Sequence, residues 1–241
     1  MSADQESIYT LISATPSPYA RKVRIVLQEK DIPFTLQTEV PWNSDTETPK
    51  YNPLEKLPVL INNKSGSAVY ESHFILEWLE AKHPNAPMLP KDIDQALFAK
   101  QIEVVADGNV QPATLHDLVL ALTDHCSGIC DALVLALWEG RRDEDKRSKP
   151  WADRQTRKVE GGLRQLSEWV EQGKGEYIIG DSLTLADVAV CSLLGFMLVR
   201  FPDHKWQSDY PKLKQYQAAL DERPTFANTR PKPQVFRDAV V

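Results

Sequence analysis

The sequence has little cysteine and no long hydrophobic run. Its three cysteines, Cys126, Cys130 and Cys191, are too few for a disulfide-stabilised scaffold. Cys126 and Cys130 lack zinc-ligand spacing, so we interpret all three as small core residues in a reducing compartment. No stretch approaches the ~20 apolar residues of a membrane-spanning helix, and no leader pattern begins the chain. We therefore expect a cytoplasmic protein that does not enter a membrane.

A surplus of positive charge is also missing. The 241 residues carry a net charge of −6, and no basic stripe is present, which argues against nucleic-acid binding. The five histidines show no metal-ligand spacing, so no metal site is expected: His73, His83, His116, His125 and His204. With 42% hydrophobic residues, the chain is long enough for one large domain or two moderate ones.

The segment Thr15–Arg24 follows the apolar, strand-like run Ile8–Ile12 and opens an amphipathic helix. Pro18 suits the first turn of that helix, because proline lacks an N–H that would have no partner there. Ser17 then lies at or beside the N-cap, where backbone N–H groups and the helix dipole favour negative charge. Two interpretations remain open: Ser17 only caps the helix, or its hydroxyl stabilises a bound thiolate.

The pattern after this helix predicts three further strands and one helix. Strands are expected over residues 33–38, 56–61 (with Pro58 near its start) and 68–70, with an irregular loop over 40–55 and a turn over 62–67. The first strand, helix and second strand form a βαβ unit with a parallel strand pair. The next helix opens at Glu71–Ser72 with an apolar face, namely Phe74, Ile75, Trp78 and Leu79. The proline-rich segment 83–90 ends it.

Beyond about Lys91 the pattern predicts helices alone. They are expected over 94–122 (kinked or divided at Pro112), 129–138, 151–172 and 211–223, with a charged connection over 139–149 and an irregular tail from Pro224. Thr184 stands three residues before Asp187 and just ahead of the apolar run 188–194. This spacing is a capping box, so we expect a buried helix to begin there.

Four segments, taken in order, resemble the glutathione S-transferase family. They are Thr15–Arg24 (a serine-type active-site motif, as in bacterial and fungal members), Asn52–Leu60 (an asparagine-proline to cis-proline segment), Tyr70–Ser72 and Leu183–Asp187. The resemblance implies an α/β thioredoxin-like N-terminal domain with a mixed βαβ-ββα sheet, followed by an all-α C-terminal domain. The implied boundaries are 1–84 for the glutathione-binding domain, 85–91 for a linker and 92–241 for the helical domain with the electrophile pocket.

The resemblance also implies a site for glutathione, which is the co-substrate. The Ser17 hydroxyl would donate to the glutathione sulfur and favour the thiolate; lowering the thiol pKa by about two units needs about 2.7 kcal/mol. A cis Leu57–Pro58 bond would present the backbone of Leu57 to the cysteinyl unit as a short added strand. Glu71 would accept the ammonium, Ser72 would bind the γ-glutamyl carboxylate, and Lys56 would reach the glycyl end.

Two departures from the family pattern bear on this site. Glu55 stands where many relatives have glycine or another small residue, and its carboxylate near the glycyl end of glutathione would weaken binding. Thr15 lies close enough to Ser17 that its own hydroxyl is an alternative partner of the sulfur.

The expected function is a glutathione transferase that conjugates glutathione to a hydrophobic electrophile and forms a homodimer. The alternatives are a glutathione-binding regulatory or scaffold protein and a glutathione-dependent reductase or lyase. The reductase chemistry usually needs a cysteine in place of Ser17, which this chain lacks. Neither the electrophile nor the dimer contacts follow from the sequence.

Overall fold

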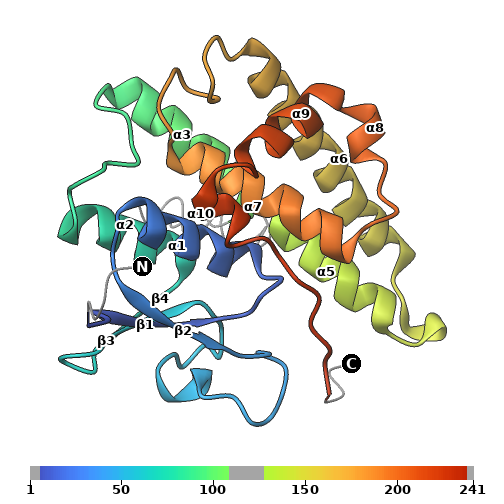
Figure 1. Cartoon of the computed structure of the whole chain (residues 1–241). Helices are drawn as coiled ribbons and strands as arrows, with labels where there is room; N and C mark the ends of the chain where they lie inside the picture. Colours follow the sequence, from blue (N-terminus) through green and yellow to red (C-terminus); the bar gives the residue numbers. More distant parts are fainter. Residues whose placement is uncertain (1–5, 109–127, 238–241) are drawn as a thin grey trace, which may run out of the picture. The chain divides into compact units, whose positions relative to one another are not determined.

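The computed structural model describes residues 6–108 and 128–237 (Figure 1). These divide into two compact units, and the division passes through one long helix. Unit 1 holds residues 6–88, 194–202 and 219–237, and unit 2 holds residues 89–108, 128–193 and 203–218. The domain boundaries expected from the sequence, 1–84 and 92–241, stay a prediction.

Unit 1 is built on a four-stranded mixed sheet in the order β2-β1-β3-β4. Strands β1 (Tyr9–Ser13) and β2 (Phe34–Thr38) are parallel, while β3 (Val59–Asn62) runs antiparallel to β1 and to β4 (Ala68–Tyr70). The βαβ unit followed by a ββα unit is the thioredoxin-like arrangement predicted from the sequence.

Two helices lie together on one face of this sheet: α1 (Pro18–Glu29) and α2 (Ser72–Lys82) (Figure 1). On the other face, Ile12, Val59 and Ile61 form an apolar cluster against which Tyr51 packs. Tyr51 follows a short 3-10 turn, η1 (Thr48–Lys50), which interrupts the loop expected over 40–55. Both faces of the two central strands are therefore covered, and burying them stabilises unit 1 through the hydrophobic effect.

The C-terminal end of α2 is closed by a buried lysine from α1. The Lys30 ammonium donates to the backbone carbonyls of His83, Asn85 and Ala86 at 2.9–3.1 Å. It also pairs with Glu80 at 2.8 Å. A cation at this place satisfies carbonyls of the C-cap His83 and of the segment that follows α2, and it complements the negative end of the helix dipole.

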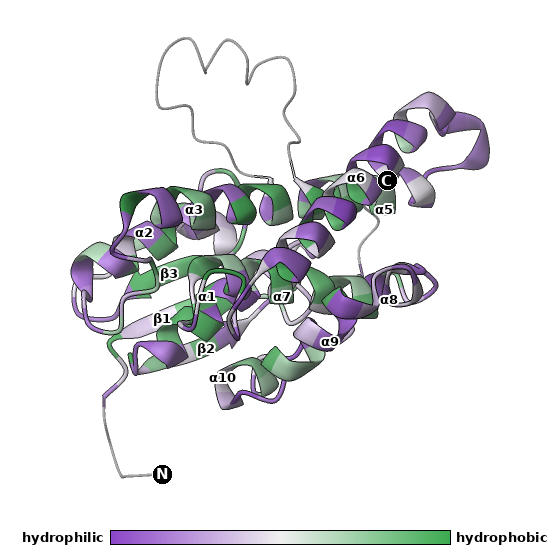
Figure 2. Cartoon of the chain, turned by 90° about the horizontal axis from the view of Figure 1, so that it is seen from above, coloured by the Kyte–Doolittle hydropathy of each residue, from purple (hydrophilic) through white to green (hydrophobic). Residues whose placement is uncertain are grey.

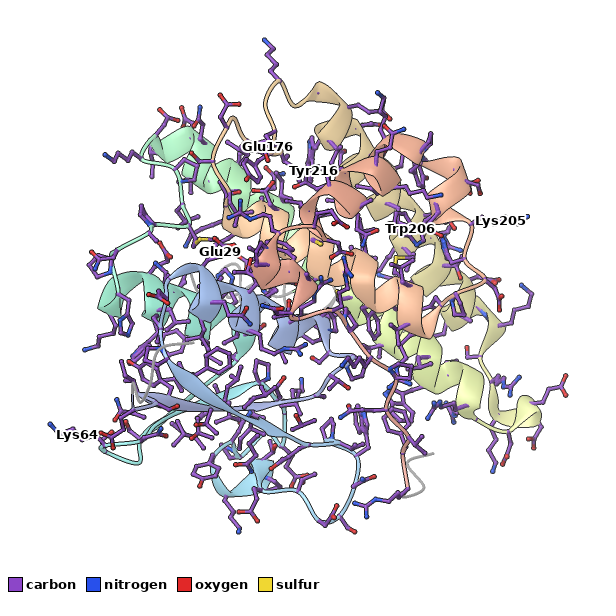
Figure 3. All side chains as sticks on the ribbon, viewed as in Figure 1. Glu29, Lys64, Glu176, Lys205, Trp206 and Tyr216 are labelled. Atoms are coloured by element: carbon purple, nitrogen blue, oxygen red, sulfur yellow. The ribbon has the colours of Figure 1, made fainter. Side chains whose placement is uncertain are left out.

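A second buried cation of α1 ties this helix to the C-terminal part of unit 1. The Arg21 guanidinium is fully buried and donates to Asp221 at 2.7 Å and to the carbonyl of Phe226 at 3.3 Å. It lies so close to Gly195 that a Cβ there would approach its Nη1 to 2.2 Å, which explains the glycine. At the end of α1, the carboxylate of Glu29 (labelled in Figure 3) forms an ion pair with the Arg223 guanidinium, with Nη2 2.9 Å from Oε2.

In the described residues of unit 2 the regular elements are all helices. Unit 2 contains α3 (Ile93–Asp107), α5 (Ile129–Arg141), η2 (Glu144–Lys146), α6 (Lys149–Gln172), most of α7 (Leu185–Arg200), α8 (Trp206–Asp209) and most of α9 (Pro211–Leu220). Helix α7 is apolar nearly all round, and its residues 186–197 are buried, as predicted. The connection between α5 and α6 is hydrophilic, as its charge run indicates (Figure 2).

Several expectations need correction. Strand β3 begins at Val59 rather than at Lys56, because residues 55–58, with the cis Leu57–Pro58 bond, form an irregular segment before it. Phe74 is 46% exposed rather than buried, since periodicity gives the direction of an apolar face but not its width. The tail from Pro224 is not wholly irregular, because Pro224–Ala227 form the short helix α10.

The helix expected over 94–122 ends earlier than Pro112. Helix α3 stops at Gly108, whose φ of 105° lies in the left-handed region that favours glycine at a helix end. The remaining part of that prediction, including Pro112, lies outside the described residues, as do Cys126, His116 and His125. Cys130 and Cys191 are buried free thiols, as expected.

Acid is expected to destabilise unit 1 through His83. The Tyr9 hydroxyl lies 2.9 Å from His83 Nε2, and burial, followed by the nearby Lys30 charge, lowers the pKa of His83 below its usual value. The unfolded chain therefore binds more protons, so the free energy of unfolding falls as the pH drops below about 6.5. Urea titrations at pH 7.5 and 5.5 should show a smaller acid-induced loss in His83→Gln than in the unaltered chain. An equal loss in both proteins would contradict this role of His83.

Candidate functional site

Three chain segments converge at one edge of the sheet in unit 1. In the register of the strands, Ile12 pairs with Val59, and Val59 pairs with Tyr70. The end of β1, the start of β3 and the end of β4 therefore meet at the same edge. The candidate residues stand directly beside these positions: Ser17 after β1, Lys56, Leu57 and Pro58 before β3, and Glu71 and Ser72 after β4.

Ser17 is the N-cap of α1, which is one of the two interpretations left open by the sequence. Its Oγ accepts from the backbone N–H of Ala20 at 3.2 Å, and Pro18 occupies the first turn. A serine hydroxyl can accept two hydrogen bonds and still donate one. The cap therefore leaves the Ser17 proton available, and the half-buried side chain stands where the helix dipole favours an anion. Capping and thiolate binding are thus compatible.

Thr15, the alternative hydroxyl, is differently engaged. Its Oγ1 donates to the carbonyl of Lys232 at 3.1 Å, and its own carbonyl accepts from the Arg24 guanidinium at 3.3 Å. Burial and the neighbouring Arg21 charge lower the pKa of Arg24 to about 10. With its proton directed to the chain itself, Thr15 is a poorer partner for a ligand sulfur than Ser17 is.

The segment before β3 contains the cis Leu57–Pro58 bond expected from the family resemblance. Asn52, which is 1% exposed, shapes this segment: its Nδ2 donates to the Lys56 carbonyl at 2.6 Å and its Oδ1 accepts from Leu54 N at 3.0 Å. Glu55 has a φ of 54°, in the left-handed region. This conformation favours glycine, as the family resemblance implies for this place. Lys56 is exposed, whereas Pro58 is buried.

Glu71, and not Ser72, caps α2. Glu71 has a φ of 74°, and its carboxylate accepts from the backbone N–H groups of His73 at 3.2 Å and Phe74 at 3.0 Å. Ser72 is the first helical residue and is 3% exposed, with its Oγ 3.5 Å from the same carboxylate. The α2 terminus thus offers a carboxylate held by N–H groups, which suits an ammonium ligand.

Sequence reasoning missed the roles of Asn52, Arg24 and the C-terminal segment beside Thr15. The Asn-Pro pair at 52–53 is a local turn signal that points to Asn52. No local signal marks the contact between Thr15 and Lys232, because these residues are 217 positions apart. For the electrophile pocket near Ser17 the sequence indicates two walls, the helix that contains Asp107–Leu122 and the C-terminal tail. From residue 109 on, the first of these walls lies outside the described residues.

Over residues 6–108 and 128–237 no group of three or more His, Cys, Asp or Glu side chains is arranged to hold a metal ion. Within the same ranges no helix is long and apolar enough to cross a membrane.

Comparison with known proteins gave consistent results. Family models described as the N-terminal and C-terminal domains of glutathione S-transferase match residues 16–82 and 132–228. A glutathione S-transferase of Methylobacterium radiotolerans, crystallised with glutathione sulfonate, is 47% identical, with 97% of this chain and 99% of that chain covered and a TM-score of 0.85.

Two curated proteins are also similar. The GST-like protein YibF of Escherichia coli is 29% identical, covering 92% of this chain and 98% of its own length. A probable maleylacetoacetate isomerase of Caenorhabditis elegans is 27% identical, covering 88% of both.

Proposed function

The chain belongs to the glutathione S-transferase family, and on that premise we propose that it binds glutathione as the thiolate and conjugates it to a hydrophobic electrophile. The observation that carries the proposal is the strand register, which gathers the Ser17, Leu57–Pro58 and Glu71–Ser72 segments at one edge of the sheet. A homodimer and a cytoplasmic location belong to the same proposal.

Each of the three segments suits one part of glutathione. The Ser17 hydroxyl donates to the sulfur and, together with the α1 dipole, stabilises the thiolate. The backbone of Leu57, next to Pro58, pairs with the cysteinyl unit, and Lys56 attracts the glycyl carboxylate. Glu71 accepts the ammonium, while Ser72 at the start of α2 binds the γ-glutamyl carboxylate.

The thiolate then attacks the electrophile, and the sulfur–carbon bond forms as the leaving group departs with its electron pair or as the electrons of a conjugated double bond shift. Ser17 is the hydrogen-bond donor in this step and not the nucleophile, because the nucleophile is the sulfur. The electrostatic stabilisation of the thiolate is preorganised by the cap of α1, so it costs little reorganisation during the reaction.

An isomerase is a second candidate, favoured by the similarity to maleylacetoacetate isomerase. In that reaction the thiolate adds to a conjugated cis double bond, the new single bond rotates, and elimination restores the thiolate. The same site residues serve both reactions. The two are distinguished by glutathione consumption: a transferase uses one glutathione per turnover, whereas an isomerase returns it.

Calorimetric titration with glutathione and with S-methylglutathione tests the proposal. Both ligands should bind, and Glu71→Gln should weaken both by about tenfold or more, because it removes a charge-assisted hydrogen bond to the ammonium. The matched control is Glu55→Gln, which removes the same charge from an exposed carboxylate with a positive φ. This variant should bind with equal or higher affinity.

Absence of binding at millimolar concentration of either ligand would overturn the proposal in favour of a scaffold or regulatory role. Equal weakening in both variants would mean that only the general charge of this edge matters and that Glu71 does not contact the ammonium.

A further inference from the structure

The last described residues of the chain, 230–237, form an extended segment without regular secondary structure that is nevertheless attached at several points (Figure 1). We call this segment the C-terminal strap. Much of it is exposed, Val235 being 81% exposed, so apolar burial does not hold it in place. Its attachment depends on hydrogen bonds, a cation-π contact and two ion pairs, of Arg237 with Asp45 and of Arg230 with Glu222, all within unit 1.

At its far end the strap is bound to the loop that follows β2. The Arg237 guanidinium pairs with both oxygens of Asp45 at 2.7 Å, and the Arg237 N–H donates to Asn43 Oδ1 at 3.1 Å. Gln234 Nε2 donates to the Glu39 carbonyl at 3.2 Å. Both contacts to Asp45 come from one nitrogen, Arg237 Nη2, and together with the two other hydrogen bonds they fix the position of the far end of the strap.

The middle of the strap is held by α7. The Arg200 guanidinium lies 5.0 Å from the centre of the Phe236 ring, within cation-π range, and its Nη2 is 3.5 Å from the Gln234 carbonyl. Arg200 belongs to the part of α7 that is in unit 1. The strap therefore has an anchor on a regular element in addition to its loop contacts.

At its near end the strap reaches the turn that carries Ser17. The Lys232 carbonyl accepts from Thr15 Oγ1 at 3.1 Å, and the turn itself is closed by Ser17 N–H donating to the Ala14 carbonyl at 3.2 Å. From α1, the Arg24 guanidinium donates to the Thr15 carbonyl at 3.3 Å. Thr15 is thus held at two points: Arg24 of α1 binds its carbonyl, and the strap binds its hydroxyl.

We propose that the C-terminal strap fixes the turn Ala14–Ser17 through Thr15, and thereby sets the position of the Ser17 hydroxyl toward the bound sulfur. The inference rests on the proposed function for its chemical consequence, but not for the strap itself. Thr15 is then a positioning residue. Because a hydroxyl must point at the sulfur to stabilise the thiolate, a loosened strap raises the pKa of the bound thiol.

Amide exchange and thiol titration test the strap in the full-length chain. In Thr15→Val and in Arg237→Ala, the Ser17 amide should exchange at least about threefold faster in the ligand-free protein, because the turn opens more often. In both variants the pKa of bound glutathione, followed by thiolate absorbance, should rise. Lys232→Ala is the matched control: the strap uses the Lys232 carbonyl, so this variant should match the unaltered protein in both measurements.

A charge-exchanged pair of substitutions tests the Arg237–Asp45 ion pair directly. Combining Arg237→Asp with Asp45→Arg should restore the exchange rate, because the ion pair is re-formed with its charges exchanged. If the exchange rate of the Ser17 amide is unchanged in Arg237→Ala and in Thr15→Val, the strap does not fix the turn and the proposal is wrong. If the pKa of bound glutathione rises in Thr15→Val and stays unchanged in Arg237→Ala, the proposed role of the strap is also wrong, because Thr15 would then face the sulfur itself. If glutathione does not bind at all, the proposed function fails, and the exchange rates still decide the strap.

Discussion

Replacing Ser17 with alanine is expected to leave the fold intact and to lower glutathione-conjugating turnover at neutral pH by about 10- to 100-fold. A hydrogen bond to a charged group contributes about 1.5–3 kcal/mol, so its loss returns the bound thiol toward its ordinary pKa and leaves less thiolate. Turnover with a model aryl halide, measured from pH 6 to 9, should show the loss at neutral pH and partial recovery at alkaline pH.

The Ser17 prediction requires a control, because the same hydroxyl caps α1 by accepting from Ala20 N at 3.2 Å. An alanine at an N-cap costs about 1 kcal/mol of stability, whereas glycine costs only a few tenths. Ser17→Gly should therefore lose as much turnover as Ser17→Ala while unfolding closer to the unaltered protein. Unchanged turnover in both variants would refute the role of Ser17 and transfer it to Thr15.

Replacing Asp187 with alanine is expected to destabilise the chain by about 3–5 kcal/mol, the largest stability effect that we predict for one side chain. The fully buried Asp187 carboxylate accepts from the N–H groups of Ile178 at 3.0 Å and Thr184 at 2.7 Å, and from Thr184 Oγ1 at 2.8 Å. It also accepts from the hydroxyl of Tyr216, labelled in Figure 3. Alanine leaves these buried donors without a partner, so a large part of a typical folding free energy is lost.

Urea denaturation followed by circular dichroism measures this loss. Two variants serve for comparison with Asp187→Ala. Asp92→Ala removes an exposed N-cap carboxylate that accepts from Gln95 N–H at 3.0 Å. Tyr216→Phe removes one of the donors to the buried Asp187 carboxylate. The Asp92 change should cost about 1 kcal/mol. A loss in Asp187→Ala no larger than that in Asp92→Ala would show that Asp187 is an ordinary helix cap.

Much of the candidate site was predictable because its signals are local. Pro18 after Ser17 is a first-turn pattern, and Ser17 is indeed the N-cap of α1. Thr184 and Asp187 have capping-box spacing, and the Asp187 carboxylate accepts from both the backbone N–H and the hydroxyl of Thr184. These interactions join residues three positions apart, so the residues that make them are read directly from the chain.

Other features depended on residues far apart in the sequence. A further partner of Asp187, Tyr216, follows it by 29 residues, and burial beside that carboxylate raises the pKa of Tyr216. At α2 the sequence placed the carboxylate and the serine side by side but did not reveal that Glu71 takes the cap, since this requires its positive φ. Phe74 has the right spacing for the core and is exposed, because burial depends on what covers the helix.

The sequence by itself determined the order of the elements, the helix starts after Ser17 and Thr184, and the family resemblance, because short-range spacing and turn chemistry act within a few residues. Only the tertiary structure decided that residues 232–237 bind beside Thr15 and Asp45, and that β1, β3 and β4 bring the Ser17, Leu57 and Glu71 segments to one edge. Those pairings join positions tens to hundreds of residues apart. No local pattern encodes them, since each partner is supplied by the packing of the whole unit.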